Sequence, residues 1–510
     1  MRGNMNKNGL KLISALSLVA ATVAMPAAAQ APPIVDLSRF YQLGDSYTAG
    51  YLDACWVEYG QRESFGAIIA RQAGVSFEQP LLGKPGLGSG IDAPNATPAQ
   101  YTGCRYLTGF SSTGTPVFAQ RKSVLSPLNL TLPRPYNNLA IPGYKVGDVT
   151  DTKAGDGNSL ADLTLRTLGG TTLLQAASQA PSFVTIFIGG NDVLGAVLNG
   201  TAIDGVTVTS VANFRAKYQK IVTDMKAAQG GTAKGIVIGL ADVTYLPYAN
   251  AVSPVIPGTN INYLGQKGGN LLGGTAAIAP IPAGSLVTLA GSVFASTGYG
   301  IPCAVFTAGG VPVGHPARAN CDKPLPDSAT AALGLPGAVL YPDEVALIKT
   351  RTEEFTADIK SIGEGSGYKF YDVRPFFQTM LAGKNIAGIT IGTPFLTGGF
   401  FSYDGFHPTS LGWALVADDI IKFMNASYGA KIPEPDLYPY LFNGNTSSGG
   451  FPTGLGLALT QDQVIAAGAQ IFGGEAWREA LKVLAPLPAN FDLEAATPVS
   501  YTDDLGKSDQ

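Results

Sequence analysis

Short apolar runs that alternate with helical patterns constrain the fold of this chain more than any other feature. Each run is five or six residues long and precedes a turn and then, sooner or later, a helix. This alternation predicts a parallel sheet covered on both faces, in which ligands bind beside the carboxyl ends of the strands. The expected strands are residues 39–43, 183–188, 235–240 and 368–373, and the expected helices are residues 160–180, 211–228, 343–362 and 410–424, the last with Thr409 as its cap.

Two long Gly/Pro-rich stretches, at about residues 76–135 and 253–335, interrupt the alternation. Because strands and helices resume after each stretch, we interpret both as insertions into one domain that spans residues 31–430. The regular pattern then fades, and residues 431–510 form a C-terminal extension with one expected helix at residues 461–484. This extension could dock on the domain, attach the protein to the cell surface, or serve in export or sorting.

Composition and charge limit the classes of partner. Apolar residues make up 45% of the chain and charged residues only 14%, so a large core can form. The formal charge is −4 and no basic cluster stands out, which argues against a nucleic-acid partner.

The first thirty residues have the three parts of a signal peptide. Arg2, Lys7 and Lys11 give a positive start, residues 12–24 form an uncharged and mostly apolar run, and residues 27–29 are alanines. A membrane anchor is the alternative, but the run is shorter than the ~20 residues that cross a bilayer. We therefore expect export to the periplasm, the cell surface or the medium.

The four cysteines are Cys55, Cys104, Cys303 and Cys321. An even number in an exported chain favours disulfides over the alternative of four buried free thiols. Of the three possible pairings, Cys55–Cys104 with Cys303–Cys321 is the most economical, because each bond would close one of the two insertions. In the chain-entropy model each such loop is stabilised by roughly 3–4 kcal/mol.

The chain has only two histidines, His315 and His407. A catalytic zinc usually takes two or three histidines, so this count argues against a histidine-built zinc site. A catalytic histidine base would have to be one of the two. His407 follows Asp404 by three residues on an expected turn, where the carboxylate could fix the orientation and tautomer of the ring. A surface-loop histidine is the alternative for an isolated Asp-x-x-His.

Three further candidates lie beside expected strands or in a glycine turn. Ser46, in Gly44-Asp45-Ser46, directly follows the first strand, and a serine hydroxyl becomes a nucleophile when a neighbouring base accepts its proton. Asn191 follows the strand at 183–188, where its amide could donate to a developing oxyanion. Gly143 permits close approach of a backbone N–H to a substrate. Each of these motifs taken alone is also an ordinary turn.

In combination these blocks resemble the four sequence blocks of the SGNH (GDSL) hydrolases, of lipase or esterase type, over roughly residues 38–427. The blocks are Gly44-Asp45-Ser46, Gly143, Gly189-Gly190-Asn191-Asp192 and Asp404-Gly405-Phe406-His407. The resemblance implies a flavodoxin-like three-layer α/β/α sandwich with about five parallel strands. It also implies that Ser46 is the nucleophile, His407 the base and Asp404 the orienting acid. The implied oxyanion hole consists of the N–H groups of Ser46 and Gly143 and the side chain of Asn191.

Such an enzyme would hydrolyse carboxylic esters through an acyl-enzyme and needs no metal or organic cofactor. We expect a small-molecule or lipid ester as substrate, and the apolar insertions slightly favour a lipid or long-chain ester, with peripheral contact to a lipid or cell surface. Two alternatives stay open. One is a carbohydrate O-acetylesterase of the same fold, and the other is a non-catalytic surface or carbohydrate-binding protein that retains the fold.

Overall fold

The structure is a computed structural model that describes residues 35–88, 102–112, 115–122, 126–268, 276–327, 337–442 and 459–472. The predicted signal peptide lies outside these residues, and so does the part of the predicted tail helix after Phe472. Among the described residues, no helix has both the length and the apolar character that spanning a membrane requires.

A parallel sheet of four strands forms the centre of the molecule, in the order β1 (Phe40–Gly44), β6 (Phe183–Phe187), β7 (Gly235–Ile238) and β12 (Lys369–Tyr371). The segment around Asn138 adds a fifth position, because Asn138 forms a parallel bridge with Gln42 on the free edge of β1. With that segment included, the order is 2-1-3-4-5, which is the flavodoxin-like arrangement. The predicted parallel sheet is confirmed, with four full strands and one short fifth segment.

The helices that the structure describes are α1 (Ser46–Ala49), α2 (Glu58–Arg62), α3 (Phe65–Gln72), α4 (Val146–Asp151), α5 (Ser159–Leu165), α6 (Thr172–Ser178), α7 (Asn191–Asn199), α8 (Val211–Ala228), α9 (Pro247–Asn250), α10 (Gly291–Ser296), α11 (Cys303–Ala308), α12 (Pro342–Ser366), α13 (Arg374–Ala382), α14 (Ser410–Tyr428), α15 (Tyr438–Phe442) and α16 (Gln461–Phe472), with 3-10 turns η2 (Val243–Tyr245) and η3 (Pro316–Arg318). Strands outside the main sheet form short antiparallel pairs: β2 (Cys55–Trp56) with β3 (Leu87–Gly88), β4 (Thr102–Phe110) with β5 (Pro116–Lys122), β8 (Leu264–Gly265) with β9 (Ala279–Pro280), β10 (Leu286–Val287) with β11 (Val339–Leu340), and β13 (Lys384–Ile386) with β14 (Ile389–Ile391).

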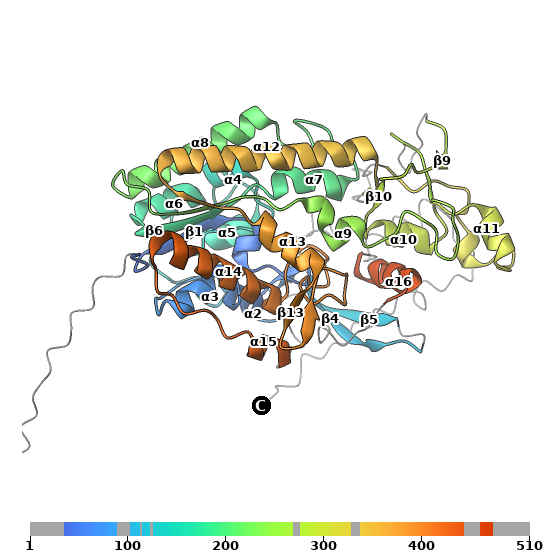
Figure 1. The fold of residues 1–510 in the computed structure, drawn as a ribbon, viewed down its shortest axis with the longest axis horizontal. Helices are drawn as coiled ribbons and strands as arrows, with labels where there is room; N and C mark the ends of the chain where they lie inside the picture. The colour runs from blue at the N-terminus through green and yellow to red at the C-terminus, as the bar shows by residue number, and fades with distance from the viewer. Residues whose placement is uncertain are drawn as a thin grey trace, which may run out of the picture.

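Helices cover both faces of the sheet. One layer contains α4, α6, α8 and α12, and the other contains α3 and α14 (Figure 1). Every residue of β1, β6 and β7 is buried, as expected for strands that are covered on both sides. The apolar runs read from the sequence therefore correspond to the core of a three-layer sandwich.

Most of the predicted helices are present, and one is wrong in part. Residues 211–228 form α8, and α14 begins after Thr409, whose side chain accepts a hydrogen bond from the N–H of Gly412. The single helix predicted for residues 160–180 is instead two helices, α5 and α6. Arg166 and the glycine pair at 169–170 adopt positive φ angles between them, which an α-helix does not permit.

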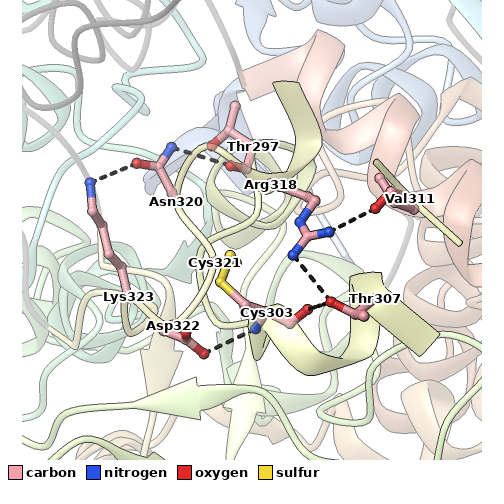
Figure 2. Close-up of a disulfide and its surroundings, with 9 residues drawn as sticks. All are labelled: Thr297, Cys303, Thr307, Val311, Arg318, Asn320, Cys321, Asp322 and Lys323. Atoms are coloured by element: carbon pink, nitrogen blue, oxygen red, sulfur yellow. Dashed lines mark hydrogen bonds between the residues drawn. A yellow bond between two sulfur atoms is a disulfide. The ribbon is translucent and has the colours of Figure 1, made fainter. Parts of the chain in front are cut away.

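Both predicted disulfides are present, Cys55–Cys104 and Cys303–Cys321. Figure 2 shows the second, where Arg318 donates to the carbonyl oxygen of Val311 and Asp322 accepts from the N–H of Cys303. The predicted alternative of free thiols is wrong, because all four cysteines are bonded.

Helix α16 of the C-terminal extension packs between the two insertions, against α10 and β5 (Figure 1). The side chain of Gln461 accepts from the N–H of Ser253, and that of Gln470 donates to the carbonyl oxygen of Pro116. A Cβ atom on Gly468 would lie 2.5 Å from Ser292 Oγ, so the helix approaches α10 closely at this glycine. This part of the extension therefore docks on the folded domain.

Candidate active site

Ser46 begins α1 directly after β1, so its side chain stands at the carboxyl edge of the central sheet. The carboxylate of Asp45 caps α1 by accepting from the N–H of Tyr47 at 2.9 Å. A Cβ atom on Gly44 would lie 2.2 Å from Thr48 Oγ1 and 2.6 Å from the carbonyl oxygen of Phe187, so the tight strand-to-helix turn requires glycine there.

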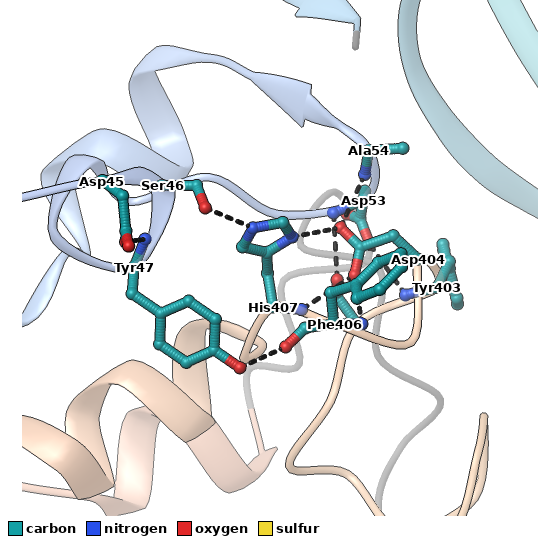
Figure 3. Close-up of polar contacts among 10 residues, drawn as sticks. Asp45, Ser46, Tyr47, Asp53, Ala54, Tyr403, Asp404, Phe406 and His407 are labelled. Carbon is teal, nitrogen blue, oxygen red and sulfur yellow. Dashed lines mark hydrogen bonds and ion pairs between the residues drawn. The ribbon is translucent and has the colours of Figure 1, made fainter. Parts of the chain in front are cut away.

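A second loop, residues 402–409 before α14, brings His407 to Ser46. His407 Nε2 lies 2.8 Å from Ser46 Oγ, and His407 Nδ1 lies 2.8 Å from Asp404 Oδ2 (Figure 3). Because an ionised carboxylate only accepts, the Nδ1–H donates to Asp404, and Nε2 is left to accept the proton of Ser46. Serine, histidine and aspartate thus form one continuous chain of hydrogen bonds.

Asp404 is fixed by backbone donors and only 1% exposed. Its Oδ1 accepts from the N–H groups of Phe406 and His407 at 2.8 and 2.9 Å, and its Oδ2 accepts from the N–H of Ala54 at 2.9 Å. Burial alone would raise the pKa of Asp404, but the charge of His407 and these hydrogen bonds outweigh it and hold the pKa below the ordinary 3.8. Asp404 is therefore a carboxylate that can orient the imidazole.

Two tyrosine rings flank the imidazole. The ring centroid of Tyr51 is 4.8 Å from that of His407, and the centroid of Tyr47 is 5.6 Å away. The Tyr47 hydroxyl also donates to the carbonyl oxygen of Phe406 at 2.5 Å, which ties the residue after Ser46 to the residue before His407. These contacts pack the imidazole of His407 beside Ser46.

The three predicted oxyanion donors stand around the same edge of the sheet. Asn191 is the first residue of α7 after β6, and one hydrogen of its amide is donated to the carbonyl oxygen of Tyr144 at 3.0 Å. That bond fixes the amide and leaves its second hydrogen for a ligand. Gly143 precedes Tyr144 in a turn with φ of +84°, a conformation that favours glycine. In the described part of the chain, no hydrogen bond engages the N–H of Ser46 or of Gly143.

An apolar pocket opens beside Ser46 and Asn191, with about 480 Å³ of empty space that includes some open solvent. Its apolar lining consists of Tyr47, Phe187, Leu194, Leu240, Ala241, Val243 and Leu246. A wider groove of about 920 Å³ adjoins it, since Ala241 and Leu246 line both. The hydroxyl of Ser46 therefore lies beside a mostly apolar surface.

Two more buried carboxyl groups lie next to Ser46 and Asn191, and one of them, Asp45, also lines the pocket. Burial raises the pKa of Asp45 to about 7 and the pKa of Asp192 to about 6. Asp192 Oδ2 accepts from the N–H of Val146 at 2.9 Å and so fixes the start of α4 next to Gly143. These residues hold the turns that carry Ser46, Gly143 and Asn191.

His315, the other histidine, lies on the exposed loop that Cys303–Cys321 closes. Its Nδ1 accepts from the N–H of Ala317 at 3.2 Å. Among the described residues, the one group of possible metal ligands is Cys303, Cys321 and Asp322, and its two sulfur atoms are bonded to each other. The two cysteines of this group therefore form a structural disulfide and are not thiolates that could bind a metal.

The sequence pattern does not single out Tyr47, Asp53 or Ala54. Tyr47 follows Ser46 directly, so its position in the chain is a usable signal. Asp53 and Ala54 contact residues about 350 positions away, at Tyr403 and Asp404, and no local pattern indicates such a contact.

Comparison with known proteins finds a family similarity in the first part of the chain. Residues 41–278 match the family model of the GDSL-like lipases/acylhydrolases. A search of curated protein sequences finds no match. A solved structure of an extracellular lipase from Streptomyces rimosus is 13% identical, with 75% of this chain and 98% of that chain covered and a TM-score of 0.29. A candidate GDSL-like lipase from Parabacteroides merdae is 12% identical, with coverage of 78% and 99% and a TM-score of 0.30.

The family match includes Ser46, Gly143 and Asn191, while Asp404 and His407 lie beyond it. The match and the three-layer α/β/α sandwich with its parallel sheet agree with each other. Residues 41–278, just under half of this chain, are thus similar to the GDSL-like lipases/acylhydrolases, and this similarity supports an ester-hydrolysing enzyme.

Proposed function

We propose that this protein is an exported serine esterase or lipase that hydrolyses carboxylic esters through a Ser-His-Asp acyl-enzyme. The observation that carries the proposal is the hydrogen-bonded chain from Ser46 Oγ through His407 to Asp404, with 2.8 Å at each step. We assign the hydrolase domain to residues 31–430 and treat residues 431–510 as its extension. The leader-like first thirty residues and the two disulfides support export.

The reaction follows from the direction of these hydrogen bonds. His407 Nε2 takes the proton of Ser46 as Oγ attacks the ester carbonyl carbon, and Asp404 stabilises the imidazolium that forms. The N–H groups of Ser46 and Gly143 and the free amide hydrogen of Asn191 then donate to the oxyanion. His407 returns the proton to the leaving alkoxide. Water then attacks the acyl-enzyme with His407 as base, and His407 returns that proton to Ser46 Oγ as the acid leaves.

The pocket beside Ser46 favours an apolar acyl group, because most of its lining is hydrocarbon. We therefore propose a lipid or long-chain ester as substrate. One observation favours a second candidate, a carbohydrate O-acetylesterase. The adjoining groove carries charged side chains of both signs, Asp242, Glu353, Lys349 and Arg374, beside the 42% exposed ring of Tyr245. These charged side chains could form hydrogen bonds with the hydroxyl groups of a carbohydrate that forms the alcohol portion of the ester.

Turnover of p-nitrophenyl esters of increasing acyl length tests these proposals. The two histidines give a matched pair of variants, since His407→Ala should abolish turnover and His315→Ala should leave it intact. Ser46→Ala should lower kcat by on the order of 10⁴-fold or more. Turnover that survives Ser46→Ala would refute the mechanism. An optimum at long chains supports the lipase, whereas collapse beyond acetate supports the deacetylase. Binding of a glycan without turnover of any ester would instead identify a non-catalytic protein.

A further inference from the structure

A two-residue turn behind the site, Asp53–Ala54, is held in an unusual backbone conformation. Both residues have positive φ angles, +55° and +56°. Leu52 and Cys55 pair across the turn, with hydrogen bonds of 3.2 and 2.9 Å. Glycine, asparagine or aspartate usually occupies such positions, so the backbone of Ala54 in particular is strained there. The surrounding structure must therefore hold the turn in place.

The turn is hydrogen-bonded to the loop that carries Asp404 and His407. The N–H of Asp53 donates to Ser402 Oγ at 3.0 Å, and the N–H of Tyr403 donates to Asp53 Oδ1 at 3.3 Å. The N–H of Ala54 donates to Asp404 Oδ2, the same oxygen that accepts from His407. Figure 3 shows Asp53 and Ala54 next to Asp404, with a dashed line from the N–H of Ala54 to the Asp404 carboxylate. Asp404 is thus held between His407 and this turn.

The carboxyl of Asp53 is buried next to a second carboxyl. Asp53 is 1% exposed, and its Oδ2 has no hydrogen-bond partner among the described residues. Burial first, and then the charge of Asp404, raise the pKa of Asp53 well above 3.8. Two neighbouring buried carboxyls do not both ionise readily. Since hydrogen bonds and His407 keep Asp404 charged, Asp53 is the member of the pair that keeps its proton.

We propose that Asp53 is a positioning residue, which acts through its hydrogen bonds to Ser402 and Tyr403 and through the turn that it anchors to fix Asp404 for its bond to His407. This inference rests on the proposed function of Asp404 and His407. An uncharged Asp53 accepts from the N–H of Tyr403 without repelling the carboxylate beside it. An ionised Asp53 would place a second negative charge against Asp404 and loosen the loop that carries the base.

The titratable groups that face Asp53 come from this one loop in the described structure. They are the carboxylate of Asp404 and the phenol of Tyr403, whose own pKa is raised mainly by burial. His407 lies on the far side of Asp404. The ring of Phe118 from β5 packs on the ring of Tyr403, with 4.9 Å between the ring centroids, and adds no charge.

Steady-state kinetics of the full-length mature protein on a p-nitrophenyl ester tests the proposal. Asp53→Ala removes the acceptor for Tyr403, so we expect kcat to fall by roughly 10- to 100-fold with KM unchanged. Asp53→Asn keeps the shape and the neutral acceptor and should rescue most of that loss. Asp418→Ala is the matched control, since Asp418 is also buried but pairs with Lys422 on α14. It should lower the melting temperature and leave kcat unchanged.

The pH profile gives a readout that a purely structural role would not move. Wild-type kcat should decline on the alkaline side as Asp53 loses its proton, and the Asp53→Asn variant should lack that decline. The proposal would be overturned if the pH profiles of the wild type and the Asp53→Asn variant were superimposable. It would also be overturned if the Asp53→Ala variant kept the wild-type kcat, or if both variants lost kcat equally. If the Asp53→Ala variant does not fold, the pH profile of kcat in the Asp53→Asn variant alone tests the proposal.

A proton NMR spectrum separates this inference from the proposed function. The low-field resonance of the His407 Nδ1–H reports its bond to Asp404 without any turnover. We expect that resonance to shift in Asp53→Ala and to stay in Asp53→Asn. An unchanged resonance in Asp53→Ala would overturn the positioning role, whereas the absence of ester turnover in the wild type would overturn the proposed function alone.

Discussion

Replacing Asp45 with asparagine is expected to stabilise the folded protein at neutral pH but not in acid. Asp45 is 5% exposed and accepts one hydrogen bond, from the N–H of Tyr47. Burial raises its pKa from 3.8 to about 7, although that hydrogen bond and the charge of His407 act in the opposite direction. Asparagine keeps the oxygen that accepts from Tyr47 and has no charge to bury.

The sign of the expected change in the free energy of unfolding follows from the direction in which the pKa of Asp45 is shifted. Below pH 3.8 the carboxyl is neutral in both states, so Asp45 and asparagine are equivalent. As the pH rises towards about 7, the unfolded chain ionises while the folded protein still binds the proton, and folding stability is lost. About three pH units at about 1.4 kcal/mol each correspond to about 4 kcal/mol. We expect Asp45→Asn to raise the free energy of unfolding by about this amount at pH 8 and by little at pH 4.

Urea unfolding at pH 4 and pH 8 measures both differences. Asp436→Asn is the matched control, because Asp436 also accepts from the N–H two residues later, at 2.9 Å, but lies on the surface. It should change the free energy of unfolding by a few tenths of a kcal/mol at most. A gain from Asp45→Asn that is the same at both pH values would refute the reasoning, since a change of packing or hydrogen bonding does not depend on pH.

Two further predictions concern the reaction itself. Asp404→Asn should lower kcat on a p-nitrophenyl ester by on the order of 10⁴-fold with the fold intact, because an amide at this position can donate to Nδ1 and impose the wrong tautomer on His407; a loss below tenfold would show that Asp404 does not orient the ring. Asn191→Ala should lower kcat by about 10²–10³-fold and change KM little, because its free amide hydrogen serves the oxyanion and not the ground state; a change confined to KM would contradict that role.

The sequence predicts the strands and most helices of this fold because their physical causes are local. The runs at β1, β6 and β7 are apolar on both faces and end at turns, and Thr409 stands one residue before α14. The error at residues 160–180 has a local cause as well. The glycine pair at 169–170 was a helix-ending signal within an otherwise helical pattern, and the structure breaks the helix there.

The contacts that fix the site are not local, and the sequence does not predict them. The bond from Ala54 to Asp404 joins residues 350 positions apart, and it depends on positive φ angles at two residues that are not glycine. The docking of α16 depends in the same way on partners in both insertions, Ser253 and Pro116. Single side chains can be assigned to a reaction from neighbouring motif residues, whereas the groups that hold them emerge only when the chain is folded.

The topology of the sheet explains why these residues meet. The segment around Asn138 pairs on one side of β1 and β6 pairs on the other, so the connections that leave these strands diverge and open a crevice at their carboxyl ends. Ser46, Gly143 and Asn191 follow these three segments and therefore surround that crevice. His407 does not come from this edge and must be brought to it by the loop before α14.

The segment that follows β1 makes that connection. Within ten residues it supplies Ser46, the Tyr47 hydroxyl bond to Phe406, and the Ala54 N–H bond to Asp404. The Cys55–Cys104 disulfide then ties the end of this segment to the first insertion. Because both halves of the site are held by the same short segment, a change there should disturb the distance between Ser46 and His407 more than an equal change elsewhere in the sheet.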